Sequence, residues 1–133
     1  MNADEKTIAD VLREYEEALN QSDIDAVMKL YAPDGVFMPQ GFPSSVGSAA
    51  VRKAYQNVFQ AINLTVKFAV AEIKQVAADW AFARTNSTGM VKVNATGQSQ
   101  PEANQELFIF QKVGNDWKIA RYCFSTTNPP AGG

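Results

Sequence analysis

Three segments of the chain repeat apolar residues at spacings of three and four, which is the pattern of an amphipathic helix. They cover residues 4–20, 24–31 and 49–62. Ser22 or Asp23 stands before the second segment and is suited to cap its first turn. We therefore predict three helices, each turning one apolar face to a common core. The positions that define these faces are Ile8, Val11, Leu12, Tyr15, Ala18 and Leu19, then Ile24, Val27, Met28 and Tyr31, then Val51, Ala54, Tyr55, Val58, Phe59 and Ile62.

Strand patterns occupy most of the remaining chain. Glycine and proline mark its turns and loops, because they favour turn conformations and interrupt regular elements. We predict a short strand at 36–38 and two long strands, at 64–76 and from 80 to about 89 or 93. We predict a turn at 32–35 and loops at 40–45 and 94–103.

The strongest strand signal is a hairpin over residues 105–125. Two runs rich in aromatic and β-branched residues flank the turn at 113–116, which contains Gly-Asn-Asp. Alternation places Leu107 and Ile109 on one face of the hairpin, and Phe108 and Phe110 on the other. Since both faces are apolar, the hairpin must be covered on both sides, by helices on one and by further protein on the other.

The order of these elements is three helices interrupted by one short strand, followed by four long strands. Such segregation predicts an α+β fold, with helices on one face of a mainly antiparallel sheet. The length of 133 residues and the lack of a linker predict a single domain over 1–133. Residues 126–133, with two prolines and two glycines, are predicted to form a frayed tail.

Charge and composition exclude several classes of function. The net charge is −2 and no Lys/Arg stripe is present, so we expect neither nucleic acid nor a membrane as partner. The chain has no histidine, which excludes a His base and a His-ligated metal, and we predict no cofactor. Cys123 is the only cysteine, and we predict that it is a small buried hydrophobic residue rather than a reactive thiol. The first residues lack the apolar core of a signal peptide, so we expect a cytoplasmic protein.

Several short stretches, taken together, resemble the NTF2-like superfamily, in particular its SnoaL-like, ketosteroid-isomerase-like and DUF4440-type branch. These stretches are residues 15–25, 30–36, 47–52 and 117–119. The resemblance covers nearly the whole chain and implies a cone, in which three N-terminal helices pack on a strongly curved sheet around a pocket. It also implies a homodimer through the outer face of the sheet.

The resemblance further implies positions for catalytic residues. In steroid isomerases, a tyrosine on the first helix and a protonated acid on a later strand form an oxyanion hole, and an aspartate is the base. By local motif these positions fall on Tyr15, Glu106 and Met38. Tyr15 matches in type and Glu106 in charge class, whereas the thioether of Met38 cannot abstract a proton. Asp34, the nearest upstream carboxylate, has the setting of a turn residue.

Two of these roles have structural alternatives. Tyr15 lies on the apolar face of its helix, so it is either a core tyrosine or part of the pocket wall. Glu106 shares a strand face with Asn104 and Phe108, and it either points inward or lies at a solvated rim.

Further residues are predicted to line the pocket. Arg84 and Asn86 share a face with Trp80 and Phe82, and we predict an ion pair between Arg84 and Glu106 inside the cone. Arg121 is an additional candidate that could equally face a dimer partner. The complete predicted set of ligand-binding residues is Phe37, Met38, Tyr55, Phe59, Trp80, Phe82, Arg84, Asn86, Asn104 and Phe108.

Two functions are compatible with this pattern. The first is a protein that binds a small hydrophobic ligand, with isomerase or cyclase activity on a carbonyl compound and Tyr15 as hydrogen-bond donor. The second is a non-catalytic dimeric assembly or accessory domain, which the missing base at Met38 favours. Transport-factor binding ranks last because the sequence offers neither a basic surface nor a peptide groove.

Overall fold

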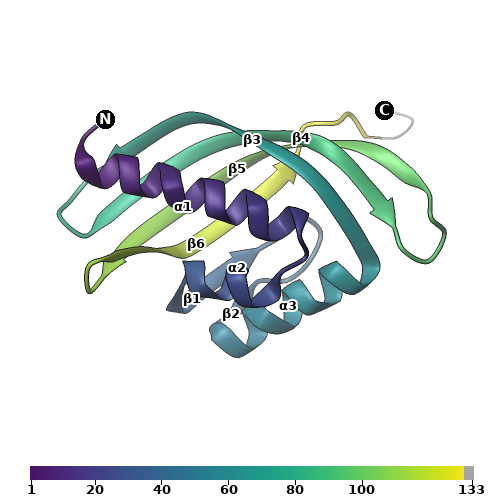
Figure 1. Cartoon of the computed structure of the whole chain (residues 1–133), viewed down its shortest axis with the longest axis horizontal. Coiled ribbons are helices and arrows are strands. Elements are labelled where there is room, and N and C mark those ends of the chain that lie inside the picture. Colours follow the sequence, from purple (N-terminus) through teal and green to yellow (C-terminus); the bar gives the residue numbers. More distant parts are fainter. Residues whose placement is uncertain (131–133) are drawn as a thin grey trace.

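The computed structural model describes residues 1–130, and Figure 1 shows the helices lying beside a curved sheet. The helices are α1 (Ala3–Asn20), α2 (Ile24–Leu30) and α3 (Ser48–Ala61). The strands are β1 (Tyr31–Met38), β2 (Ser45–Val46), β3 (Ile62–Gln75), β4 (Trp80–Val93), β5 (Ser99–Val113) and β6 (Asp116–Thr126). This arrangement agrees with the predicted α+β cone.

The sheet has the strand order β2-β1-β6-β5-β4-β3. Strands β3 to β6 form the predicted antiparallel meander, whereas β1 pairs in parallel with β6, so the sheet is mixed. The turn between β5 and β6 is short because Gly114 adopts a φ of 64°, in the left-handed region that glycine tolerates. Aromatic side chains cover part of the concave side, where the rings of Phe108 and Tyr122 stack with their centroids 4.2 Å apart.

Two predicted loops are wrong in part. Residues 32–35 belong to β1, where the register with β6 shifts between Tyr31 and Val36, so the expected turn is an irregular section of strand. The loop predicted at 94–103 is shorter, because β5 already begins at Ser99 and pairs with β4. The reason is that tertiary pairing satisfies the backbone of polar residues that have low strand propensity.

The tail predicted at 126–133 begins inside β6, which includes Thr126. The Thr127 N–H donates to the Ala103 carbonyl at 2.9 Å, and the Asn128 N–H donates to Thr126 Oγ1 at 3.1 Å. Residues 131–133 lie outside the described part of the chain.

Helix α1 covers β3, the outer strand of the meander, and protects its free edge. The Asn20 side chain accepts from the Val66 N–H at 2.7 Å and donates to the Val66 carbonyl at 2.9 Å. Glu16 Oε1 accepts from the Phe68 N–H at 2.6 Å, and Glu5 Oε2 from the Gln75 N–H at 3.0 Å. Polar side chains of α1 thus satisfy an edge that could otherwise pair with another chain.

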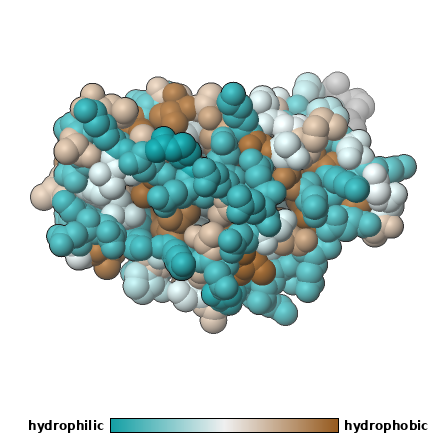
Figure 2. All heavy atoms as spheres, viewed as in Figure 1, coloured by the Kyte–Doolittle hydropathy of each residue, from teal (hydrophilic) through white to brown (hydrophobic). Residues whose placement is uncertain are grey.

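The exposed surface around α1 is mainly hydrophilic, whereas its inward stripe is buried (Figure 2). Its first turn carries a capping box, in which the Asn2 side chain accepts from the Glu5 N–H and the Glu5 side chain accepts from the Asn2 N–H. The buried stripe includes Tyr15 and Leu19, which α1 therefore presents to the concave face of the sheet.

A close approach between β3 and β4 requires glycine at position 89. A Cβ atom added to Gly89 would lie 1.9 Å from the Thr65 carbonyl oxygen, far inside van der Waals contact. Gly89 pairs with Val66 on β3 and with Glu102 on β5. The missing side chain allows the meander to curve tightly here, and this curvature creates space between the sheet and the helices.

Candidate functional site

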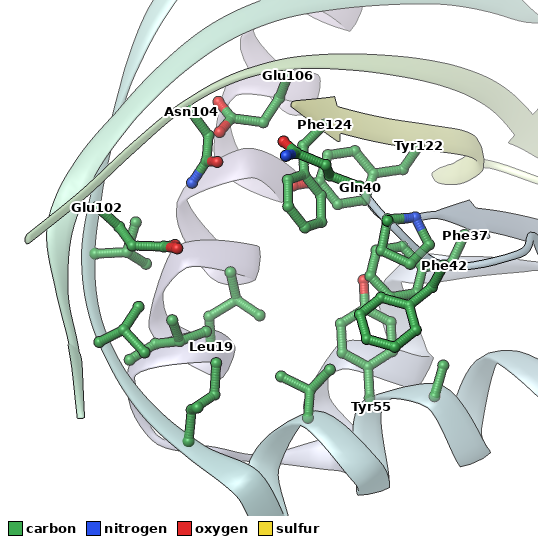
Figure 3. A pocket seen from close by; sticks show the side chains of 18 of the residues that line it. Leu19, Phe37, Gln40, Phe42, Tyr55, Glu102, Asn104, Glu106, Tyr122 and Phe124 are labelled. Carbon is green, nitrogen blue, oxygen red and sulfur yellow. The ribbon is translucent and has the colours of Figure 1, made fainter. Parts of the chain in front are cut away.

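The concave side of the sheet holds a cavity of about 1080 Å³. This volume is at or just above the range of about 300–1,000 Å³ that is usual for small-molecule sites. Helices α1 and α3, strands β3 to β6 and the segment 39–45 contribute to its wall. Figure 3 shows side chains from these elements around a shared open space.

A chain of three tyrosine hydroxyls lies beside this cavity. Tyr55 of α3 is in the middle, and its hydroxyl oxygen lies 2.7 Å from that of Tyr15 on α1 and 2.7 Å from that of Tyr31 on β1. All three side chains are buried, and Tyr15 and Tyr55 line the cavity. Since three hydroxyls have three protons and their two mutual bonds use two, one proton remains for a further acceptor.

Tyrosine hydroxyls are protonated at neutral pH, and burial moves their pKa values still further from it. Burial raises the pKa of Tyr15, and the negative charge of Glu106 adds to that rise. Burial also raises the pKa of Tyr31 and Tyr55 well above the ordinary tyrosine value. A protonated phenol in a site of low polarity is a strong hydrogen-bond donor, so the cluster is able to stabilise negative charge on a ligand oxygen.

Glu106 of β5 lies in the same cavity wall and is 6% exposed. Thr85 Oγ1 donates to its Oε1 at 2.6 Å, and Ser87 Oγ donates to its Oε2 at 2.6 Å. A carboxylate has about four lone-pair positions, so these two bonds leave acceptor capacity for a ligand. Burial raises the pKa of Glu106 above the ordinary carboxyl value, while the bonds from Ser87 and Thr85 oppose the rise.

This raised pKa predicts a specific pH dependence of stability. The native state holds the Glu106 proton more tightly than the unfolded chain does, so Glu106 favours folding at low pH and this contribution is lost as pH rises through the native pKa. We expect the free energy of unfolding of wild type, minus that of Glu106→Gln, to fall from about pH 4 towards neutrality. Urea denaturation of both proteins measures this difference. The contributions of the other carboxylates cancel in it because both proteins contain them. A difference that stayed constant or grew with pH would contradict the assignment.

The structure places the predicted site residues in three groups. Tyr15, Phe37, Tyr55, Asn104 and Glu106 line the cavity. Phe59 and Phe108 pack in the core without lining it, and Phe108 stacks under Tyr122.

The third group contains the wrong predictions, which lie away from the cavity. Met38 is 42% exposed and lies outside the cavity wall, because alternation in β1 turns its neighbour Phe37 inward. The strand face of Trp80, Phe82, Arg84 and Asn86 is the outer one, since the alternate residues Ala81, Ala83, Thr85 and Ser87 are the buried set.

The predicted ion pair between Arg84 and Glu106 is therefore wrong. Arg84 is exposed and its Nε donates to Glu72 Oε1 of the neighbouring strand at 2.5 Å. Glu106 points to the opposite face and is bonded by hydroxyls. The sequence shows which residues share a face, but Trp80 and Phe82, the aromatic residues of β4, lie on its outer face, whereas its inner face carries small residues, so aromatic content pointed to the wrong face.

Several cavity residues were not found from the sequence. Ser87 lines the cavity and Thr85 is buried behind it as a donor to Glu106, and both fall on the strand face that was taken as the outer one. Glu102 falls in the segment predicted as a loop, although continuing the alternation from Phe108 through Glu106 and Asn104 leads to it. Tyr122 and Phe124 belong to the inner face of β6 and also line the cavity, as Figure 3 shows.

Within residues 1–130, no group of three His, Cys, Asp or Glu side chains is placed to hold a metal ion. In the same range, no helix is both long and apolar enough to cross a membrane.

Comparison with known proteins identifies the family. The profile of the SnoaL-like domain matches residues 12–122. The chain belongs to the SnoaL-like family. A ketosteroid isomerase-like protein from Erwinia carotovora atroseptica SCRI1043 is 36% identical, with a TM-score of 0.92 over 97% of this chain and 100% of that one. The predicted NTF2-like resemblance and fold are thereby confirmed.

More distant structures share the fold of this SnoaL-like chain. A conserved protein from Planctomyces limnophilus DSM 3776 is 23% identical, with a TM-score of 0.81 over 93% of this chain and 98% of that one. The hexachlorocyclohexane dehydrochlorinase LinA-type3 from Novosphingobium barchaimii LL02 is 12% identical, with a TM-score of 0.85 over 95% of this chain and 88% of that one. At these identities the likeness concerns the fold alone. None of the curated proteins compared with the chain matches it.

Proposed function

We propose that this SnoaL-like protein binds a small hydrophobic carbonyl compound in its cavity and transfers a proton at the carbon next to the carbonyl. Such a step belongs to isomerase- and cyclase-type reactions. The observation that carries the proposal is that a hydroxyl donor chain and a buried carboxylate line one cavity. The similarity to a ketosteroid isomerase-like protein supports it.

Tyr15 is the hydrogen-bond donor in this proposal. Either oxygen can donate in each of the two tyrosine pairs. We assign Tyr31 as the donor to Tyr55 and Tyr55 as the donor to Tyr15, because this order leaves the Tyr15 proton for the carbonyl oxygen of the ligand. As the α-proton leaves, negative charge grows on this oxygen and its hydrogen bond strengthens. An interaction that is stronger in the transition state than in the ground state accelerates the reaction.

Glu106 is the base in this proposal. Thr85 and Ser87 donate to its two oxygens, which holds the carboxylate in place and favours its ionised form. The raised pKa makes Glu106 a better proton acceptor than an ordinary surface carboxylate. The carboxylate takes the α-proton, the electron pair of the C–H bond enters the enolate, and the proton returns at the same or a conjugated carbon. With Glu106 as the base, no other base is needed near Met38, which stands where steroid isomerases have their aspartate.

The remaining cavity residues would bind the body of the ligand. Phe37 stacks on Tyr55 with centroids 4.6 Å apart, and this pair forms part of the cavity wall. Apolar side chains of α1, α3 and β3 face the same space, so we propose a hydrophobic pocket.

Deuterium exchange tests the proposed reaction without knowledge of the natural substrate. The probe is 2-tetralone, an apolar bicyclic ketone with acidic α-protons. We expect the protein to accelerate loss of its α-proton NMR signals in D₂O, and calorimetry to show binding. Absence of both binding and acceleration would overturn the proposal and favour a non-catalytic assembly or accessory domain.

We further propose a homodimer through the outer face of the sheet. Leu107 is 39% exposed there, and Cys123 is its register partner on β6. Phe82 and Ile109 pair on the same face, between the neighbouring strands β4 and β5. This is the second apolar face of the hairpin, and a second copy would cover it. Arg121 lies exposed beside Ile109 on this face.

A charged residue at the centre of this face should prevent dimerisation. We expect wild type to sediment as a dimer and Leu107→Glu as a monomer, because an unpaired charge cannot be buried in an apolar interface. Val76→Glu is the matched control, since Val76 is 59% exposed and lies in the turn between β3 and β4. A monomeric wild type would overturn this proposal.

The location in the cell is a separate proposal. A single cysteine, Cys123, suits a reducing compartment, and we propose the cytoplasm on this ground.

A further inference from the structure

Two polar side chains of β5, Glu102 and Asn104, point into the cavity. Glu102 and Asn104 both line the cavity and are half-buried. Within residues 1–130, neither side chain makes a hydrogen bond or an ion pair, whereas Glu106 on the same strand face accepts two hydroxyls. Figure 3 shows Glu102, Asn104 and Glu106 directed into the same space.

A neighbouring part of the wall is apolar, since Val66 of β3 is in register with Gly89 of β4 and Gly89 with Glu102. Near Glu102 and Asn104 the cavity thus has an edge of acceptor groups and an apolar surface next to it. A ligand that fits must be apolar over most of its body and polar along one edge. The apolar wall is made by Leu19 of α1, Val58 and Ala61 of α3, and Ile62, Leu64 and Val66 of β3.

The charge of this edge is negative. The charged residues that line the cavity are Lys53, Glu102 and Glu106. Lys53 is exposed on α3 and forms no ion pair within the described residues. A half-buried carboxylate that has no ion pair within residues 1–130 favours a cationic hydrogen-bond donor over an anion.

Spacing along the strand sets the length of the ligand. Residues 102, 104 and 106 alternate onto one face of β5. At about 3.3 Å per residue, Glu102 lies about 13 Å from Glu106 along the strand. A ligand whose reacting carbon is at Glu106 would therefore place its opposite end at Glu102.

We propose that Glu102 and Asn104 bind a protonated amine at the end of the ligand remote from the reacting carbonyl. The Glu102 carboxylate and the Asn104 side-chain oxygen accept hydrogen bonds from the ammonium, while the apolar wall holds the body between the two ends. This inference rests on the proposed function, since it concerns the same cavity, but it requires binding only and no turnover.

Three probes that share one body test the inference. The body is 4-acetylbiphenyl, and its 4′ substituent is an aminomethyl, an ethyl or a carboxylate group. Calorimetry with the full chain should give the tightest binding for the ammonium, about tenfold tighter than for the isosteric ethyl compound, and the weakest for the carboxylate.

Substitutions then assign the preference to the residues. Glu102→Gln should remove the advantage of the ammonium and leave the affinity for the ethyl compound unchanged. The variant should fold, because Glu102 has no partner to lose within residues 1–130, and its melting temperature checks this. Glu72→Gln is the matched control, since it removes the same charge from the outer face, where Glu72 pairs with Arg84, and should keep the preference.

The outcomes separate this inference from the proposed function. Equal affinities of wild type for the ammonium and ethyl probes would overturn the inference while leaving the cavity as a ligand site. A preference that survives Glu102→Gln would overturn it as well. Failure of all three probes and of 2-tetralone to bind would overturn the proposed function itself.

Discussion

Replacing Glu106 with Gln should slow the deuterium exchange of 2-tetralone by about 10²- to 10⁴-fold, the usual contribution of a positioned general base. The amide has nearly the same shape, so it still contacts Thr85 and Ser87, but it cannot take the α-proton. NMR of the α-proton signals in D₂O measures the rate for both proteins. Binding of the ketone, followed by calorimetry, should change far less than the rate.

Glu72→Gln is the control for this experiment because it removes one carboxylate from the exposed outer face. Its exchange rate should equal that of wild type. A Glu106→Gln variant that is as fast as wild type would show that another group takes the proton, even if the cavity binds the ketone.

The pH dependence of exchange gives an independent measure of the same role. Since only ionised Glu106 accepts a proton, the rate should rise with pH through its native pKa, which burial raises above the ordinary carboxyl value. If the exchange rate instead rose with pH around the ordinary carboxyl pKa, the base would be a solvated carboxylate.

Removing the Tyr15 hydroxyl should have the second largest effect on the rate of deuterium exchange. We expect Tyr15→Phe to slow exchange by about 10²- to 10³-fold, as is usual when one donor of an oxyanion site is lost. The cost in stability should be only about 1 kcal/mol, because one hydrogen bond to Tyr55 is lost and the buried ring stays in place. Exchange kinetics and urea denaturation of the same preparations give the two numbers.

Tyr31→Phe provides a graded comparison. Tyr31 is two hydroxyls away from the ligand in the proposed donor chain, so its loss weakens the donor only through Tyr55. We expect a smaller decrease in exchange than for Tyr15→Phe, at a similar cost in stability. Equal decreases in exchange for the two variants would show that the tyrosines act on stability alone and that Tyr15 has no direct contact with the ligand.

Much of the fold could be read from local patterns because helix and strand periods are properties of neighbouring residues. The three helices, the meander and the hairpin over 105–125 follow from spacing and turn chemistry. The errors fall where tertiary pairing overrides local preference. Residues 99–103 are strand because β4 lies beside them. Pro33 and Gly35 lie in β1 because β6 pairs with both ends of that strand.

The candidate site could be predicted only in part. Tyr15 and Glu106 were found by their motifs, and the structure places both in one cavity wall. The hydroxyl chain was missed because Tyr15, Tyr31 and Tyr55 come from three different elements, and no short-range pattern connects them. Arg84 was misplaced because alternation defines two faces of a strand without saying which is inward.

By itself, then, the sequence determined the three helices, the long strands, their order and which residues share a strand face, but not the short strand β2. It also showed that the chain has four tyrosines and no histidine. Only the tertiary structure decided which faces line the cavity and which partners Glu106 and Arg84 have. The physical reason is that periodicity acts within one element, whereas the inward direction depends on how the sheet curves at Gly89 and on where α1 and α3 lie across it.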